Sequence, residues 1–78
     1  MTQCERILAH IEQYGSITSK TAMDEYGIMR LASRISELRR QGVPIAAQIV
    51  IGKNRYGEKI RYSEYMFMNK KEIRNEHD

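Results

Sequence analysis

The sequence predicts a single α+β domain in which three helices precede a β-hairpin. As far as residue 42, apolar residues recur every three or four positions, which is the period of one helix face. From residue 43 onward they alternate along the chain, which is the period of a strand. Glycines at 15, 27 and 42 divide the first part into three segments of helical length. A chain of 78 residues has room for one such domain.

The first helix is expected from about Gln3 to Tyr14. Thr2 and Glu5 have the spacing of a capping box, in which each side chain satisfies an amide of the other residue. Gly15 can supply a left-handed cap at the C-terminal end. Apolar side chains recur along this helix at Cys4, Ile7, Leu8, Ile11 and Tyr14.

The second helix is expected from about Ser19 to Tyr26. Thr18 is its candidate N-cap and Gly27 its stop. The small side chain of Ala22 allows another helix to approach closely, and Ile17 is expected to anchor the segment between the first two helices. The resulting helix is short, about two turns.

The third helix is expected from Met29 or Arg30 to Gln41, with Gly42 after it, and position 29 lacks a strong N-cap. At helical period its apolar stripe consists of Leu31, Ile35 and Leu38. The opposite face carries Arg30, Ser33, Glu37 and Arg40, with Arg34 on the flank. Arginines and short polar side chains are the residue types that contact phosphates and base edges.

The hairpin is expected to consist of a strand over residues 43–51, a turn over 52–58 and a return strand over 59–67. Alternation predicts one well-buried face, made of Val43, Ile45, Ala47, Ile49 and Ile51. Ile60 and Tyr62 differ in parity from Tyr65 and Phe67, which predicts a bulge near Ser63 and Glu64. The domain is expected to span residues 1–68, and the charged, polar residues 69–78 are expected to form a flexible tail.

Charge is segregated along the chain. Residues 30–61 contain eight basic and two acidic side chains, a net charge of +6, whereas the rest of the chain sums to −3. A surface without a charged partner is expected to mix its signs more evenly. The basic half therefore suggests a polyanion on one side of the molecule, although uneven charge in a small protein remains an alternative.

Several classes of function lack the residues they need. Cys4 is on an apolar helix face, His10 is placed on the polar side of the first helix, and His77 is in the tail, so no pair has the spacing of metal ligands or of a nucleophile and its base. No phosphate-binding loop, cofactor site, small-molecule site or membrane span is evident, so catalysis is not expected. A single cysteine fits a reducing compartment, and a cytoplasmic protein is expected.

Two helices joined by a short turn that contains a glycine form a helix-turn-helix, and a hairpin after them gives the order of a winged helix-turn-helix domain. The stretches at residues 15–45 and 53–67 resemble a family of small winged helix-turn-helix domains that are often encoded in phages and prophages. The resemblance is carried by Ser16 to Ser19, by Gly27-Ile28, by residues 30–39 and by the turn at 54–57. Met29 departs from the pattern, because threonine is expected there.

The resemblance implies that the third helix enters the major groove of DNA and that the hairpin, as a wing, lies on the backbone or in the minor groove. Carried onto this sequence, the candidates for reading bases are Arg30, Ser33, Arg34 and Glu37. Glu37 can accept from a cytosine amino group, or it can form a salt bridge with Arg34, Arg40 or Arg30.

The candidate backbone contacts come from the second helix, the end of the third and the wing. They are Ser19, Lys20, Thr21, Arg40, Lys53, Arg55, Tyr56, Lys59 and Arg61. Arg55, at the tip, can enter a narrow minor groove. Tyr56 either packs on a sugar or phosphate or folds back onto the hairpin. Arg39 either forms an internal ion pair or contacts a phosphate.

Two hypotheses of function follow. The first is sequence-specific binding of double-stranded DNA, as a small transcriptional regulator or an excisionase-type architectural factor. The second is a protein-interaction module that uses the winged-helix surface to engage a host or phage protein, because a fold does not settle a function. The oligomeric state is left open by the sequence; a homodimer or tandem binding on DNA is compatible with it, since one helix and one wing cover only a half-site.

Overall fold

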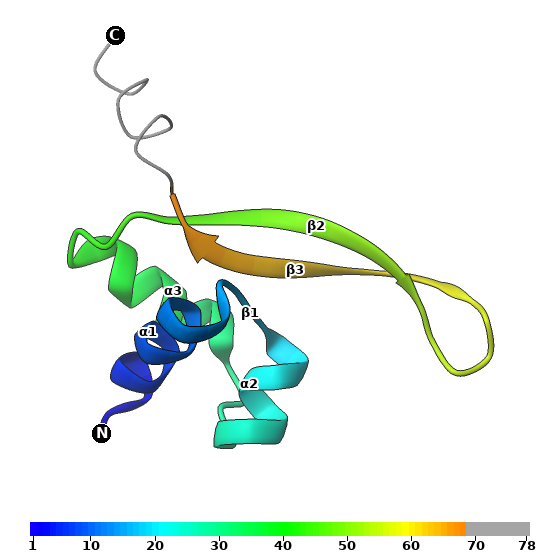
Figure 1. The fold of residues 1–78 in the computed structure, drawn as a ribbon, viewed down its shortest axis with the longest axis horizontal. Helices are drawn as coiled ribbons and strands as arrows, with labels where there is room; N and C mark the ends of the chain where they lie inside the picture. The colour runs from blue at the N-terminus through cyan, green and yellow to red at the C-terminus, as the bar shows by residue number, and fades with distance from the viewer. Residues whose placement is uncertain (69–78) are drawn as a thin grey trace, which may run out of the picture.

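The computed structural model describes residues 1–68, which form three helices and a three-stranded antiparallel sheet (Figure 1). The elements in chain order are α1 (Gln3–Tyr14), β1 (Ile17–Thr18), α2 (Ser19–Tyr26), α3 (Leu31–Arg40), β2 (Ile45–Lys53) and β3 (Lys59–Phe67). The predicted α+β class and the order of three helices before a hairpin are confirmed. The predicted tail from residue 69 lies outside the described residues.

The ends of α1 and α2 are the predicted ones. The Glu5 amide donates to Thr2 Oγ1 at 3.1 Å, and the Thr2 amide donates to Glu5 Oε1 at 2.8 Å, so the capping box is complete. Thr18 caps α2 by accepting from the Thr21 amide at 3.2 Å. Both helices end at glycines with positive φ, 93° at Gly15 and 67° at Gly27, where a side chain would be strained.

α3 begins at Leu31, slightly later than predicted. Ile28 is fully buried and its amide donates to the Ala22 carbonyl at 3.1 Å, so the turn must direct this side chain into the core before a new helix can start. The residue at the N-cap position, Arg30, makes no capping hydrogen bond through its side chain. The start of α3 is therefore uncapped by a side chain, as the lack of a strong N-cap residue in the sequence predicts.

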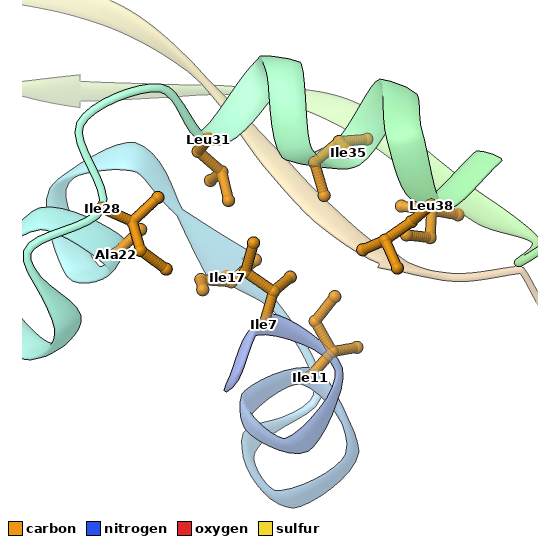
Figure 2. Close-up of a cluster of buried hydrophobic side chains, with 9 residues drawn as sticks. Ile7, Ile11, Ile17, Ala22, Ile28, Leu31, Ile35 and Leu38 are labelled. Atoms are coloured by element: carbon orange, nitrogen blue, oxygen red, sulfur yellow. The ribbon is translucent and has the colours of Figure 1, made fainter. Parts of the chain in front are cut away.

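The core lies between α1 and α3 and is closed by β1, the α2–α3 turn and the start of β2 (Figure 2). Its fully or nearly fully buried members are Ile7, Ile11, Ile17, Ala22, Ile28, Leu31, Ile35, Leu38 and Ile45. The predicted stripe of α3 thus faces α1, and burial of each large aliphatic side chain contributes about 1.5–3 kcal/mol. The face of α3 opposite this stripe is left open.

His10 contradicts its predicted placement on a polar face. Only 9% of the residue is exposed, and its Nδ1 lies 2.6 Å from the Tyr26 hydroxyl. The ring also lies against Tyr14, with 4.6 Å between centroids. Tyr26 of α2 covers that side of α1, which the sequence of α1 alone does not show. A buried imidazole with a hydrogen-bond partner is acceptable in a core.

The sheet has the order β1-β3-β2, and β1 was not predicted. It is only two residues long, Ile17 opposite Tyr65 and Thr18 opposite Glu64, too short to show alternation. The predicted bulge near Ser63 is wrong, because the β2–β3 register runs without a break from one end of the hairpin to the other. Ile60 and Tyr62 lie on the opposite face of β3 from Tyr65. Tyr65 packs against the core at the base of the hairpin, whereas Ile60 and Tyr62, nearer the tip, are exposed.

The predicted well-buried face of β2 is also wrong beyond its first residues. Ile45 is buried, but Ile49 is 56% exposed and Ile51 is 66% exposed. The hairpin extends well past the helices, so its outer half has no layer to pack against (Figure 1). Alternation in a sequence shows that two faces differ, not that either face is covered.

Candidate nucleic-acid interface

The outer face of α3 is open and carries short polar and basic side chains. Arg30 and Arg40 are exposed, whereas Ser33 and Glu37 are half-buried. Ser36 is exposed on the same side and was not among the predicted residues, although its position three residues after Ser33 places it on that face. Short side chains at these positions leave the helix narrow enough to enter a groove closely.

Arg34 is held on the flank of α3. Its Nη2 lies 3.1 Å from Glu37 Oε1, and its Nε is buried without a hydrogen-bond partner within residues 1–68. The other oxygen of Glu37 accepts from Cys4 Sγ of α1 at 3.6 Å. The structure therefore favours the salt-bridge interpretation of Glu37, with Arg34 as its partner.

The same contacts keep Cys4 protonated. Burial raises the pKa of the Cys4 thiol, and the hydrogen bond to the Glu37 carboxylate and its negative charge raise this pKa further. Cys4 thus acts as a donor that ties α1 to α3 and not as a thiolate nucleophile.

Within residues 1–68 Arg39 does not form the internal ion pair that was one of its two predicted roles, and the other role, a phosphate contact, stays a prediction. Its Nε donates to the Ile45 carbonyl at 3.1 Å, which fastens the last turn of α3 to the start of β2. Arg40, the next residue, makes no salt bridge within the described residues and is exposed. Of the two arginines in the last turn, Arg40 is the one on the open face.

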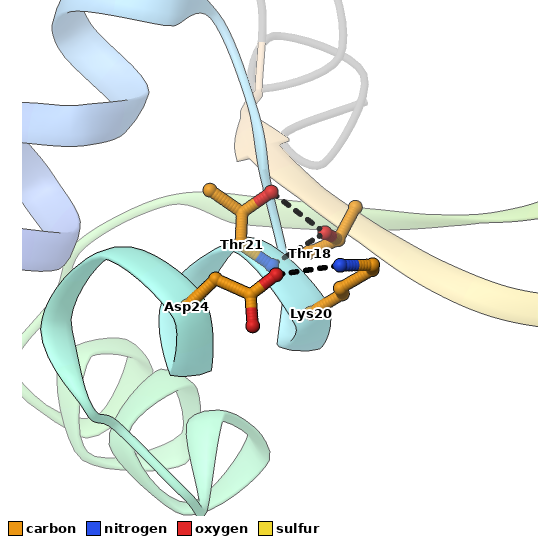
Figure 3. A network of polar contacts seen from close by, with 4 residues as sticks. All are labelled: Thr18, Lys20, Thr21 and Asp24. Carbon is orange, nitrogen blue, oxygen red and sulfur yellow. Dashed lines mark hydrogen bonds and ion pairs between the residues drawn. The ribbon is translucent and has the colours of Figure 1, made fainter.

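The start of α2 presents a second group of candidates (Figure 3). Lys20 Nζ lies 2.5 Å from Asp24 Oδ2, and this hydrogen bond raises the pKa of Lys20, so Lys20 is a cation at neutral pH. Both side chains are exposed, and such surface pairs are weak enough for a phosphate to replace the carboxylate. Ser19 is exposed, and Thr21 is half-buried beside the cap Thr18.

The tip of the hairpin is an ordered turn. Asn54 Oδ1 accepts from the amides of Tyr56 and Glu58 at 2.9 and 3.1 Å, and Asn54 Nδ2 donates to Glu58 Oε1 at 3.1 Å. This Asn-centred turn holds Arg55 and Tyr56 outward. Tyr56 is 78% exposed, so the alternative that it folds back onto the hairpin is wrong.

Lys53 and Lys59 lie directly opposite each other at the end of the hairpin. Directly opposed residues of an antiparallel pair project to one face, and like charges there are destabilising. Arg61 follows on the same face, and none of the three makes a salt bridge within residues 1–68. An anion supplied from outside the described residues would relieve this repulsion.

α2 and the hairpin come together around one groove of about 730 Å³. From α2 and its cap it is lined by Thr18, Ser19, Lys20 and Thr21, and from the hairpin by Gly52, Lys53, Asn54, Arg55, Ile60 and Tyr62. The predicted backbone contacts of α2 and of the hairpin tip thus share one depression. Ile60 and Tyr62 also line its wall; neither was predicted to do so, because an apolar side chain in a strand favours a core position.

The structure brings most of the candidates into two places, the open face of α3 and the groove between α2 and the hairpin. Tyr56, Lys59 and Arg61 lie on the hairpin but do not line the groove. Within residues 1–68 no group of three His, Cys, Asp or Glu side chains is placed to hold a metal ion. In the same residues no helix has the length and apolar character needed to cross a membrane.

A helix-turn-helix with an open basic second helix, followed by a hairpin, defines the class of winged helix-turn-helix proteins. A family model described as a winged helix-turn-helix domain matches residues 2–70, and the chain belongs to this family. Membership suggests DNA binding. Comparison with curated proteins and with solved structures gives no match.

Proposed function

We propose that this protein binds double-stranded DNA in a sequence-dependent manner, with α3 in the major groove. Arg30, Ser33 and Arg34 are the proposed base contacts, together with Ser36. Arginine can bind two acceptors of a guanine, and serine can contact several bases. Glu37 is proposed to orient Arg34, because its carboxylate is already shared between Arg34 and Cys4.

The proposed contacts to the DNA backbone come from the groove between α2 and the hairpin and from the last turn of α3. Ser19, Lys20 and Thr21 face a phosphate from one side of the groove. The cations of the hairpin approach the same strand or the neighbouring minor groove from the other side. Lys53 and Arg55 do so from the lining of the groove, whereas Lys59, Arg61 and Tyr56 are proposed to do so from parts of the hairpin outside it.

One observation carries this proposal. Of the basic side chains from Arg30 to Arg61, only Arg34 forms a salt bridge within the described residues. The remaining cations are concentrated on α3 and the hairpin, which are the two elements that a winged helix-turn-helix domain directs at DNA. Unpaired cations in this arrangement match the phosphates of a duplex.

The role proposed for the protein is that of a small transcriptional regulator or an excisionase-type architectural factor. One α3 and one hairpin cover only a half-site. We therefore propose that the protein acts on DNA as a homodimer or as tandem copies.

Fluorescence anisotropy with a mixed-sequence duplex at low salt tests the proposal. Affinity should fall steeply as salt rises, with a slope in log–log form of about 0.9 for each phosphate neutralised. Selection of bound sequences from a random duplex pool then tests sequence preference and gives the half-site spacing. No binding at low salt would contradict the proposal. Capture of a stoichiometric protein partner on α3 would then favour the protein-interaction hypothesis.

A further inference from the structure

β2 forms an open edge of the sheet. The strand order β1-β3-β2 gives β2 a neighbour on one side only, and no segment within residues 1–68 pairs with its outer side (Figure 1). The strand runs from Ile45 to Gly52 without a charged residue. An exposed edge of this length and character is a template for another strand.

The hydrogen bonds at the two ends of the hairpin show which backbone groups are free. The Met68 amide donates to the Pro44 carbonyl at 2.9 Å, and the Asn54 amide donates to the Glu58 carbonyl at 3.0 Å. In an antiparallel pair, alternate residues direct both backbone groups toward the partner strand. Even-numbered residues of β2 therefore bond to β3, and odd-numbered residues direct their groups outward.

Three residues of β2 carry the free groups, namely Ala47, Ile49 and Ile51. The outward carbonyl of Ile45 is already occupied by Arg39 Nε at 3.1 Å, which closes the edge at one end. Lys53 closes it at the other, because a charged side chain discourages strand pairing. The free segment is thus short, uncharged and bounded on both sides.

We propose that a second copy of this chain pairs with this segment in antiparallel orientation, about a twofold axis at Ile49. Ile49 then lies opposite Ile49 of the second copy, and Ala47 lies opposite Ile51 of the second copy. About six backbone hydrogen bonds form, since each of the three residues on either strand directs one donor and one acceptor across the axis. The two sheets become one continuous sheet, and a large side chain meets a small one on either side of the axis.

A second copy carries the same short, uncharged free edge, so pairing of the two copies satisfies the free backbone groups of both chains at once. Only with the axis at Ile49 do the three free residues pair solely with one another. Moving the axis toward Ala47 places the occupied carbonyl of Ile45 in the pairing, and moving it toward Ile51 brings in Lys53. The segment is therefore complementary to itself, as a twofold interface requires.

This dimer does not depend on DNA, and its response to salt distinguishes it from DNA binding. At the ends of the paired segment, Lys53 comes close to Arg39 of the second copy. Salt screens this repulsion between cations, so dimerisation should strengthen as salt rises. DNA binding should weaken over the same range.

Sedimentation equilibrium on the full chain without DNA tests the proposal. The wild type should show a species of twice the 9.2 kDa chain mass, with weight-average mass rising with protein concentration. I49K places two ammonium groups opposite each other and should raise the dimer dissociation constant at least about tenfold. I60K is the matched control, because Ile60 is on β3, away from the free edge of β2. The dimer dissociation constant of I60K should stay within about twofold of the wild-type value.

Amide hydrogen exchange gives a readout that needs no substitution. The amides of Ala47, Ile49 and Ile51 should become more protected as protein concentration rises, whereas other exposed amides should not. The proposal is overturned by a chain that stays monomeric up to about 1 mM. It is equally overturned by a dimer that I49K leaves intact, or by edge amides that exchange equally fast at all concentrations. Circular dichroism checks that both variants are folded.

Discussion

Arg34 forms an ion pair within α3 and is also proposed to contact a base. The ion pair with Glu37 fixes its guanidinium on the flank of α3, yet a third of its side chain remains exposed. A fixed arginine loses less conformational freedom when it binds a base than a free one does. The pair can therefore serve recognition, with Glu37 as a positioning residue.

Arg34→Ala should relax the sequence preference. Loss of a bidentate contact to a guanine removes about 1–3 kcal/mol of discrimination at one base position. Arg40→Ala, at the end of the same helix, should instead weaken binding to all duplexes and lower the salt slope by about one. Competition anisotropy with the selected site and its single-base variants measures both effects. Equal loss on all sequences for Arg34→Ala would contradict its role in reading a base.

Glu5 makes the start of α1 sensitive to acid. The hydrogen bond from the Thr2 amide lowers the pKa of Glu5 below its ordinary value of 4.5. A carboxyl group with a lowered pKa in the folded state contributes stability above its unfolded pKa and loses it as pH falls through the folded pKa. The melting temperature of Glu5→Ala should thus lie below that of the wild type at pH 7, and the gap should narrow as pH falls below the ordinary glutamate pKa of 4.5 and through the lower pKa of the folded state. A gap that is constant with pH would contradict this.

At the scale of elements, the start of α2 depends on one hydroxyl. Thr18→Ala removes the acceptor for the Thr21 amide and should destabilise the domain by about 0.5–2 kcal/mol. Thr18→Ser keeps the hydroxyl and should lose much less, which makes it the matched control. Urea unfolding followed by circular dichroism measures both. Equal destabilisation by the two variants would point to the methyl group and not the cap.

In the hairpin, the opposed cations of Lys53 and Lys59 lower the stability of the fold but would attract an anion. Lys53→Ala removes one of two opposed like charges and should leave the free energy of unfolding unchanged or raise it by up to about 1 kcal/mol. The same change should weaken binding to every duplex alike and reduce the salt slope by about 0.9. Arg6→Ala on α1 removes the same charge outside the proposed interface and should alter neither quantity. A Lys53→Ala variant with wild-type affinity would place the hairpin outside the DNA contact.

Across the whole molecule, the sequence predicted elements where a local signal existed. Capping residues and glycines located both ends of α1 and α2, and the stripe of α3 identified its buried face. Errors arose where a neighbour decides the environment. His10 is buried because α2 covers it, and Ile49 is exposed because nothing covers the outer hairpin. The strand β1 is held by pairing with β3 alone, so two residues carried no signal.

The candidate interface was predictable as a set of residue types but not as an arrangement. Charge segregation located the cations on α3 and the hairpin. Only the fold shows that Glu37 forms a salt bridge with Arg34 and that Arg39 donates a hydrogen bond to a backbone carbonyl of β2. The groove between α2 and the hairpin joins residues more than thirty positions apart, a relation set by the β1–β3 pairing and absent from any local pattern.

Binding of DNA should stabilise the entire fold, because the proposed interface draws on α2, α3 and the hairpin together. A ligand that binds only the folded state at 100 times its dissociation constant stabilises it by about 2.7 kcal/mol. For a domain of this size, that corresponds to a rise in melting temperature of roughly 10–20 °C. Thermal unfolding with and without duplex at low salt measures the rise. It should shrink as salt is added, because the cations that couple the three elements to the phosphates are screened. An unchanged melting temperature at saturating duplex would mean that the DNA does not engage the folded domain.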